Sequence, residues 1–186
     1  MFIQTEATPN PQTIKFLPGG EVMAQGVAEF LTAEDAQQKS PLAARLFDID
    51  GVASVFYGAD FIAVTKTNQV EWSDIKTFIL GVLFEHFSMK KPLMMIGTDT
   101  SSHAVQGEET ELTRKICELL DARVRPAVAR DGGDIVFHSF QNGVVFLKMR
   151  GACAGCPSST MTLKVGIENM LRHYIPEVLE VRAVAD

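Results

Sequence analysis

The clearest hydrophobic pattern in the chain lies between residues 72 and 87, in the stretch WSDIKTFILGVLFEHF. Apolar side chains and one histidine recur there at spacings of three and four, which is typical of one face of an α-helix. The members of this face are Ile75, Phe78, Ile79, Val82, Leu83 and His86. The pattern predicts a helix that opens at Trp72 and Ser73. We expect the stripe Phe78, Val82 and Phe87 to lie in the core, and His86 to be a core histidine.

The residues before this helix alternate between short apolar runs and turns. Phe2–Thr5 and Ile14–Leu17 are predicted strands, and Ser40-Pro41 is a typical helix start, with Ser as cap and Pro first in the helix. That helix runs through LAARLF and stops near Gly51, and the runs VASVFY and FIAVTK flank Gly-Ala-Asp, which predicts a hairpin. The resulting order, ββαββα, indicates an antiparallel sheet covered by helices.

A second set of elements follows residue 110. The face Ile116, Leu119, Leu120 and Val124 predicts a helix, RDGGD at 130–134 a turn, and Asn142-Gly143 between two apolar runs a hairpin. A further helix is predicted from about Ser159, ending before Pro176, and VLEVRAV reads as a last strand. This order is αββαβ.

The two sets are separated by GTDTSSHAVQGEET, residues 97–110, which is polar and lacks hydrophobic periodicity. We therefore expect an α+β protein of two small domains, residues 1–96 and 108–186, joined by a linker over 97–107. Each segment is long enough to own a modest core.

Composition narrows the function classes. The 186 residues carry a net charge of −6, which argues against a nucleic-acid partner, and no apolar run approaches the ~18 residues of a membrane helix. The first basic residue is Lys15. The sequence therefore predicts no secretory or Arg-rich leader and a bacterial cytoplasmic location. A mature organellar protein of the mitochondrial matrix would look the same.

Candidate chemistry is concentrated in MRGACAGCPSST, residues 149–160, where Cys153 and Cys156 are surrounded by small residues. The pair lies between a predicted strand and a predicted helix, and the helix amino terminus should lower both thiol pKa values. Thiolate serves both metal ligation and thiol redox chemistry. Small neighbours suit a bulky inorganic cluster, and Pro157 after a cysteine also occurs in ferredoxin motifs.

Ligand counting favours a site shared between two chains. A [4Fe–4S] cluster or a structural zinc usually takes four ligands, and this loop offers two. The third cysteine, Cys117, lies in a predicted helix and is expected to be a small buried hydrophobe. Two alternatives stay open. One is a thiol–disulfide oxidoreductase with Cys153 as nucleophile and Cys156 as resolver, and the other is zinc bridging two chains.

The stretch from Arg125 to Val178 resembles the NifU-like carboxy-terminal domain of Nfu iron–sulfur proteins, through Asp131-Gly132-Gly133-Asp134, Gly151-x-Cys153-x-x-Cys156-Pro157-Ser158-Ser159 and Tyr174-Ile175-Pro176-Glu177. The first segment resembles the Nfu amino-terminal domain through TEATPNPQTIKFLPG, SPLAARLFDIDGVASVFYG and DFIAVTK.

The resemblance implies a non-enzymatic scaffold or carrier. In that role a homodimer holds one [4Fe–4S] cluster through Cys153 and Cys156 of each protomer. The cluster comes from upstream assembly proteins and is delivered to apo iron–sulfur client proteins.

Other polar residues have simpler expected roles. Asp131 and Asp134 are expected to shape their turn, with Gly132 and Gly133 supplying unusual backbone angles. The arginines at 123, 125, 130 and 150 are expected to be solvated surface rather than a docking patch. No histidine is expected to be a ligand.

Overall fold

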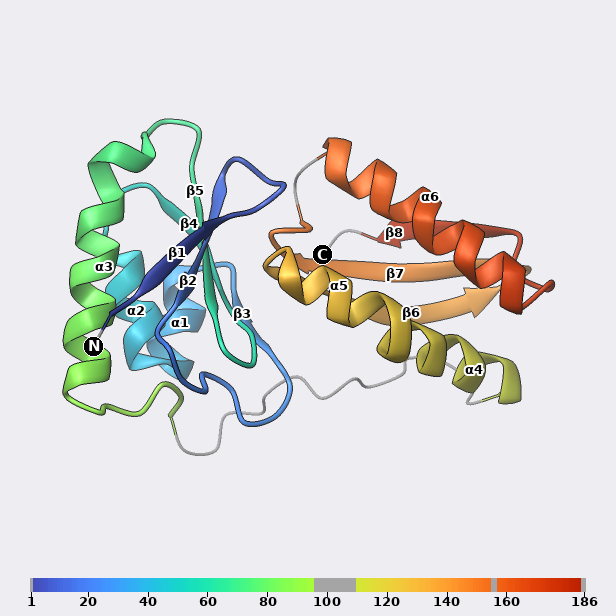
Figure 1. Cartoon of the computed structure of the whole chain (residues 1–186), viewed down its shortest axis with the longest axis horizontal. Helices are drawn as coiled ribbons and strands as arrows, with labels where there is room; N and C mark the ends of the chain where they lie inside the picture. The colour runs from blue at the N-terminus through green and yellow to red at the C-terminus, as the bar shows by residue number, and fades with distance from the viewer. Residues whose placement is uncertain (1, 96–109, 155–156, 185–186) are drawn as a thin grey trace. The chain divides into compact units, whose positions relative to one another are not determined.

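The computed structural model describes residues 2–95, 110–154 and 157–184. The chain divides into two compact units, Met1–Ser102 and His103–Asp186, and both mix helices and strands (Figure 1). The predicted α+β class is therefore confirmed. The predicted linker, 97–107, lies outside the described residues, and the proposed domain bounds stay a prediction.

The first unit is built on a five-stranded antiparallel sheet. Its strands are β1 (Gln4–Ala7), β2 (Thr13–Leu17), β3 (Ala28–Phe30), β4 (Val52–Tyr57) and β5 (Ile62–Lys66), in the spatial order β1-β2-β5-β4-β3. Helices α1 (Ala33–Lys39), α2 (Pro41–Phe47) and α3 (Trp72–Ser88) cover one face of this sheet (Figure 1). The pairs Phe16–Ile62 and Val55–Val64 place buried side chains of neighbouring strands on that face.

Two elements of this unit were not predicted, and the expected order ββαββα is to that extent wrong. Strand β3 has only three residues, Ala28–Phe30, so its alternation of apolar and polar residues is too short to predict a strand. Helix α1 has a single buried residue, Ala36, which leaves it without an apolar stripe. The start of α2 is as predicted, because the Ser40 hydroxyl accepts a hydrogen bond from the Ala43 amide at 3.0 Å.

The predicted buried face of α3 is wrong in one place. Ile75, Ile79, Leu83 and His86 are buried, but Phe78 is 66% exposed and Val82 is half-buried. The buried stripe therefore follows only the positions that point at the sheet. Phe78 is one residue before Ile79, and the helical rotation of about 100° per residue turns it to the edge of that stripe.

The second unit contains a three-stranded sheet of β6 (Gly133–Gln141), β7 (Val144–Gly151) and β8 (Glu180–Val184). Strands β6 and β7 form the predicted hairpin, and the positive φ angles of Asn142 (50°) and Gly143 (81°) suit a tight two-residue turn. Strand β8 pairs with β7 in parallel, so the chain must cross over between them. Helix α6 (Pro157–Tyr174) makes that crossover, and it begins two residues before the predicted start.

The first helical run of this unit has three parts, α4 (Glu111–Leu119), the π-helical turn η1 (Leu120–Val124) and α5 (Arg125–Arg130). The Arg125 amide bonds back to the Leu120 carbonyl, five residues earlier. Pro126, which follows, has no amide hydrogen to donate. This run and α6 lie on one face of the sheet (Figure 1). The alternating residues Val145, Leu147 and Met149 of β7 are buried with them in one core.

Among the helices of the described residues, none has the length and the apolar composition of a membrane-spanning segment.

His86 predicts a pH dependence for the first unit. Its side chain is fully buried. Burial lowers its pKa below the ordinary value of 6.5 and outweighs the backbone of Pro92 and Lys91, which raises it, while the positive charges of Arg45 and Lys91 act in the same direction as burial. Below pH 6.5 the unfolded chain therefore binds more protons than the folded one, and stability must fall as the pH falls.

We expect the unfolding free energy of this unit to decrease from pH 7 to pH 5. The fluorescence of Trp72, the single tryptophan, measures this unfolding. His86→Leu should flatten the slope, whatever its effect on absolute stability. His138→Gln, in the other unit, should leave the slope unchanged. An unchanged slope in His86→Leu would contradict this assignment.

Candidate functional site

The cysteine loop lies where strand β7 ends and helix α6 begins, within the crossover that makes β7 and β8 parallel neighbours. The structure describes this loop as far as Ala154. Cys156, the second predicted site residue, lies outside the described residues together with Gly155. The geometry of the site is therefore that of Cys153 and of the residues on which its side chain packs.

The backbone before Cys153 is tied to the start of β6. Gly151 is the register partner of Gly133, and its φ of 61° lets β7 turn sharply at this point. The Ala152 amide donates to the Gly132 carbonyl at 3.1 Å, and the Ala154 amide donates to the Gly151 carbonyl at 3.0 Å. The first half of the loop is thus held by strand pairing and by two short backbone hydrogen bonds.

The Cys153 side chain packs directly on Gly133. The residue is 7% exposed and belongs to the hydrophobic core of its unit. A β-carbon placed on Gly133 would lie 2.7 Å from the Cys153 sulfur and 2.6 Å from the Arg150 carbonyl oxygen. Gly133 is therefore needed for space, whereas its neighbour Gly132 adopts the expected unusual conformation, with φ at 82°. The spatial role of Gly133 was missed in the sequence, because it depends on a contact twenty residues away.

A buried ion pair fixes the residue after Gly133. Asp134 is 4% exposed and accepts two hydrogen bonds from Arg125, Nε to Oδ1 at 2.8 Å and Nη2 to Oδ2 at 3.2 Å. Arg125 also donates to Asp121 at 3.1 Å. Burial opposes the charge of Arg125, but these carboxylates outweigh it and raise the arginine pKa. The pair joins α5 to β6 next to Gly133, the residue on which Cys153 packs.

The expected roles of the neighbouring charges are only partly right. Asp131 is exposed and ends α5, which fits a turn residue, whereas Asp134 is the buried partner of Arg125. The four arginines do not share one solvated role. Arg125 is held by two carboxylates, and Arg123 lies over the ring of Tyr174, 4.9 Å from its centroid.

The remaining candidate ligands do not gather around Cys153. Cys117 is half-buried and packs against the same core, so it is less buried than expected. Within residues 2–95, 110–154 and 157–184, no group of three or more His, Cys, Asp or Glu side chains is placed to hold a metal ion.

Comparison with known families matches most of the chain to two domain families. Residues 3–90 match the family described as Scaffold protein Nfu/NifU N terminal. Residues 116–182, which include both cysteines of the loop, match the NifU-like domain.

Curated relatives match over the whole chain. A protein of Drosophila ananassae named NFU1 iron-sulfur cluster scaffold homolog, mitochondrial, is 46% identical over 186 residues, which are 100% of this chain and 65% of the relative. NifU-like protein 5, mitochondrial, of Arabidopsis thaliana is 47% identical over 182 residues, which are 96% of this chain and 66% of that protein. The chain thus spans just under two thirds of these relatives.

Among solved structures, a NifU-like protein from Saccharomyces cerevisiae is similar to part of the chain. It covers 52% of this chain and 86% of its own, at 24% sequence identity and a TM-score of 0.47. The family relationship therefore stands on the sequence matches.

The packing of Cys153 on Gly133 predicts a change in thiol reactivity. Gly133→Ala must displace the sulfur or the backbone beneath it, so the rate at which iodoacetamide alkylates Cys153 should rise several-fold, as measured by peptide mass spectrometry. Gly166→Ala is the matched control in the same unit, because a β-carbon there meets nothing within 4 Å. Equal rates in the two variants would mean that Gly133 does not position the thiol.

The ion pair predicts a stability difference. Arg125→Ala leaves the Asp134 carboxylate buried without its partner, which should cost about 3 kcal/mol, the low end for a buried pair because Arg125 is partly exposed. Lys115→Ala removes an exposed pair with Glu111 and should cost less than about 0.5 kcal/mol. Hydrogen exchange of the β6 and β7 amides measures this unit separately from the other. A cost for Arg125→Ala as small as that for Lys115→Ala would show that the pair does not hold α5 to β6.

Proposed function

This chain belongs to the Nfu/NifU family of scaffold proteins, and from that premise we propose that it is a non-enzymatic scaffold or carrier of iron–sulfur clusters. Two copies hold one [4Fe–4S] cluster through Cys153 and Cys156 of each copy. They receive it, or its components, from upstream assembly proteins and pass it to apo iron–sulfur client proteins.

The relatives support the class of cargo. The Drosophila proteins are named iron-sulfur cluster scaffold homologs and are 45–47% identical to this chain. Both loop cysteines fall within the stretch that matches the NifU-like domain. The names also place these relatives in mitochondria. For this chain we propose a reducing compartment, bacterial cytoplasm or mitochondrial matrix, where thiols persist.

The single observation that carries the assignment of Cys153 is the packing of its side chain on Gly133. The thiol is held at the end of a strand on Gly133, and the strand pairing of Gly133 with Gly151 gives it a defined starting position. Thiolates are soft ligands that suit iron–sulfur clusters, so the donor chemistry fits the cargo. Cys153 is 7% exposed, and its sulfur has to turn outward from this packed position to bind iron.

Ligand counting supports the shared arrangement. The chain has three cysteines, and Cys117 packs against the core, which leaves two thiolates per copy for a cluster that takes four. A second copy supplies the other two through a symmetric interface.

The proposed transfer is ligand exchange. Each iron–thiolate bond to Cys153 or Cys156 that breaks is replaced by one to an incoming thiolate of the client. The departing cysteine takes up a proton or stays as thiolate. No change in the oxidation state of iron or sulfide is required, which is consistent with a carrier rather than an enzyme.

The first unit is proposed to recognise donors or clients. Residues 1–96 contain no cysteine, so they supply no thiolate to the cluster. If the first unit recognises partners and the second binds the cluster, deletion of residues 1–96 must leave cluster binding intact.

The proposal predicts the composition of the loaded protein. After anaerobic reconstitution with iron and sulfide, native mass and chemical analysis should give a dimer with about four iron and four sulfide ions. Cys153→Ser or Cys156→Ser should abolish loading, and Cys117→Ser, the matched control, should not. A chain lacking residues 1–96 should still load.

Other outcomes point to the alternative chemistries. Mixed disulfides trapped by Cys156→Ser, with no iron bound by the unaltered chain, would identify a thiol–disulfide oxidoreductase. A dimer that holds zinc and rejects iron would identify a zinc bridge. Loss of loading on deletion of residues 1–96 would refute the division between the units.

A further inference from the structure

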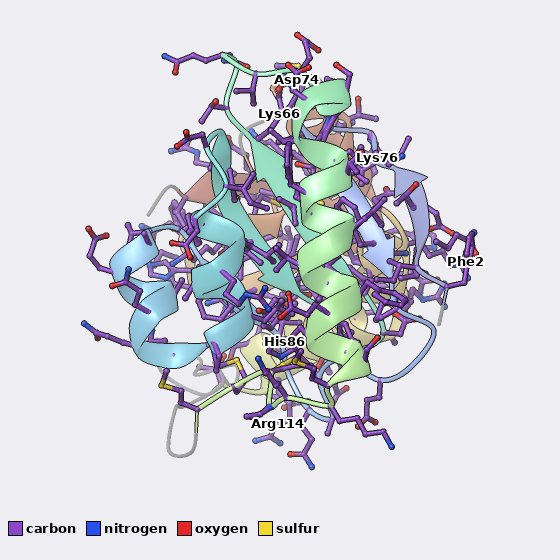
Figure 2. The ribbon with its side chains drawn as sticks, turned by 90° about the vertical axis from the view of Figure 1, so that its left-hand side faces the viewer. Phe2, Lys66, Asp74, Lys76, His86 and Arg114 are labelled. Carbon is purple, nitrogen blue, oxygen red and sulfur yellow. The ribbon has the colours of Figure 1, made fainter. Side chains whose placement is uncertain are left out.

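A groove lies in the first unit between helices α2 and α3, far along the chain from the cysteine loop. It has a volume of about 620 Å³, and its walls come from the end of α2 with the following turn, from Val70, and from the part of α3 between Asp74 and Val82. Figure 2 shows these helices side by side on one face of the unit, with Asp74 near the end of α3 where the groove lies. Neither the helix packing nor the proposed cluster chemistry uses this space.

The floor and one rim of the groove are apolar. Ile49, Val70, Ile75 and Val82 line it, and Phe78 stands at its edge with 66% of its surface exposed. Grooves of this size with apolar linings are typical binding sites, and an exposed aromatic ring beside one is the usual form of an anchor. Phe84, also on α3 and 49% exposed, does not line the groove.

The charged residues of the groove are mainly acidic. Asp48, Asp50 and Asp74 line it together with the apolar side chains. The one basic lining residue, Arg45, is bound by Glu85, with Nη2 donating to Oε2 at 2.6 Å. That pair also lowers the pKa of Glu85, so the carboxylate that faces Arg45 is charged at neutral pH. The groove therefore presents negative charge beside apolar surface.

We propose that this groove binds a cationic amphipathic segment of a partner protein. Apolar side chains of the segment, spaced as on one helix face, enter the groove beside Phe78, and its lysines or arginines approach the three aspartates. Complementary charge speeds association and selects among partners. The identification of that partner as a donor or client of the cluster rests on the function proposed above, but the binding itself does not.

A second copy of the chain is the less favourable occupant. A symmetric dimer through this groove would place each acidic rim opposite its own copy. The repulsion between like charges would then oppose the burial of Phe78. Charge complementarity requires a basic partner instead.

The test uses the full chain and a fluorescein-labelled helical peptide of about 16 residues. The peptide carries leucine at positions i, i+3, i+4 and i+7 and lysine on the flanks, and a second peptide replaces each lysine with glutamate. Fluorescence anisotropy should show binding of the lysine peptide, weakening with added salt, and no binding of the glutamate peptide. Phe78→Ser should weaken binding about tenfold or more, as loss of an anchor does.

Matched variants distinguish binding in the groove from nonspecific hydrophobic binding. Phe84→Ser removes a similarly exposed phenylalanine of the same helix and should leave the affinity within about twofold. Asp48→Asn with Asp50→Asn should weaken binding and reduce its salt dependence. Equal losses for Phe78→Ser and Phe84→Ser, binding of the glutamate peptide, or no binding of either peptide would overturn the proposal. Self-association that Phe78→Ser abolishes would also overturn it, in favour of a second copy.

Cluster loading distinguishes this proposal from the previous one. Phe78→Ser should load iron and sulfide like the unaltered chain, and Cys153→Ser should bind the lysine peptide like the unaltered chain. Failure of loading with retained, Phe78-dependent peptide binding would refute the cluster proposal alone.

Discussion

The pairing of Gly133 with Gly151 is the constraint on which the proposed site depends. These glycines bring the first residue of β6 against the last residue of β7, and the absence of a side chain on Gly133 makes room for the Cys153 sulfur. The bidentate pair of Arg125 and Asp134 then holds β6 to α5 one residue further on. The position of the thiol is thus set at least in part by packing on Gly133 and by strand pairing.

The ion pair between Arg125 and Asp134 bears on the irregular helix before β6. Arg125 has to reach Asp134 from a helical run that also packs Ile116, Leu120 and Val128 into the core. A regular α-helix is interrupted at Leu120–Val124 by a π-helical turn, and it resumes with Arg125 facing the carboxylate. Such turns rotate the residues that follow them relative to the residues before, and they are frequent at functional sites.

Local signals in the sequence were enough for part of this structure. The Asn142-Gly143 turn, the Ser40 cap and the position of the cysteines between strand and helix all depend on a few neighbouring residues, and each was predicted. Strand β3, the exposed Phe78 and the fit of Gly133 against Cys153 depend on residues distant in sequence. Periodicity assigned Phe78 to the core because its spacing matches a buried face, but only the positions of α3 that point at the sheet are buried, and Phe78 lies at the edge of that stripe. Cys156 lies outside the described residues, so its pairing with Cys153 rests on the sequence and the family.

The chemistry of the cargo explains why a carrier of this kind needs a surface away from its cysteines. Exchange of one thiolate for another at iron discriminates little between proteins that both offer cysteine ligands. Specificity then has to come from contacts that the cluster does not make. Residues 1–95 carry eleven acidic against seven basic side chains, and residues 110–184 carry ten basic against eight acidic ones. The acidic groove beside Phe78 lies in the unit without thiols. Under the proposed function, partner selection there would use no thiolate that the cluster needs, so affinity for the partner and lability of the cluster could be set by different residues.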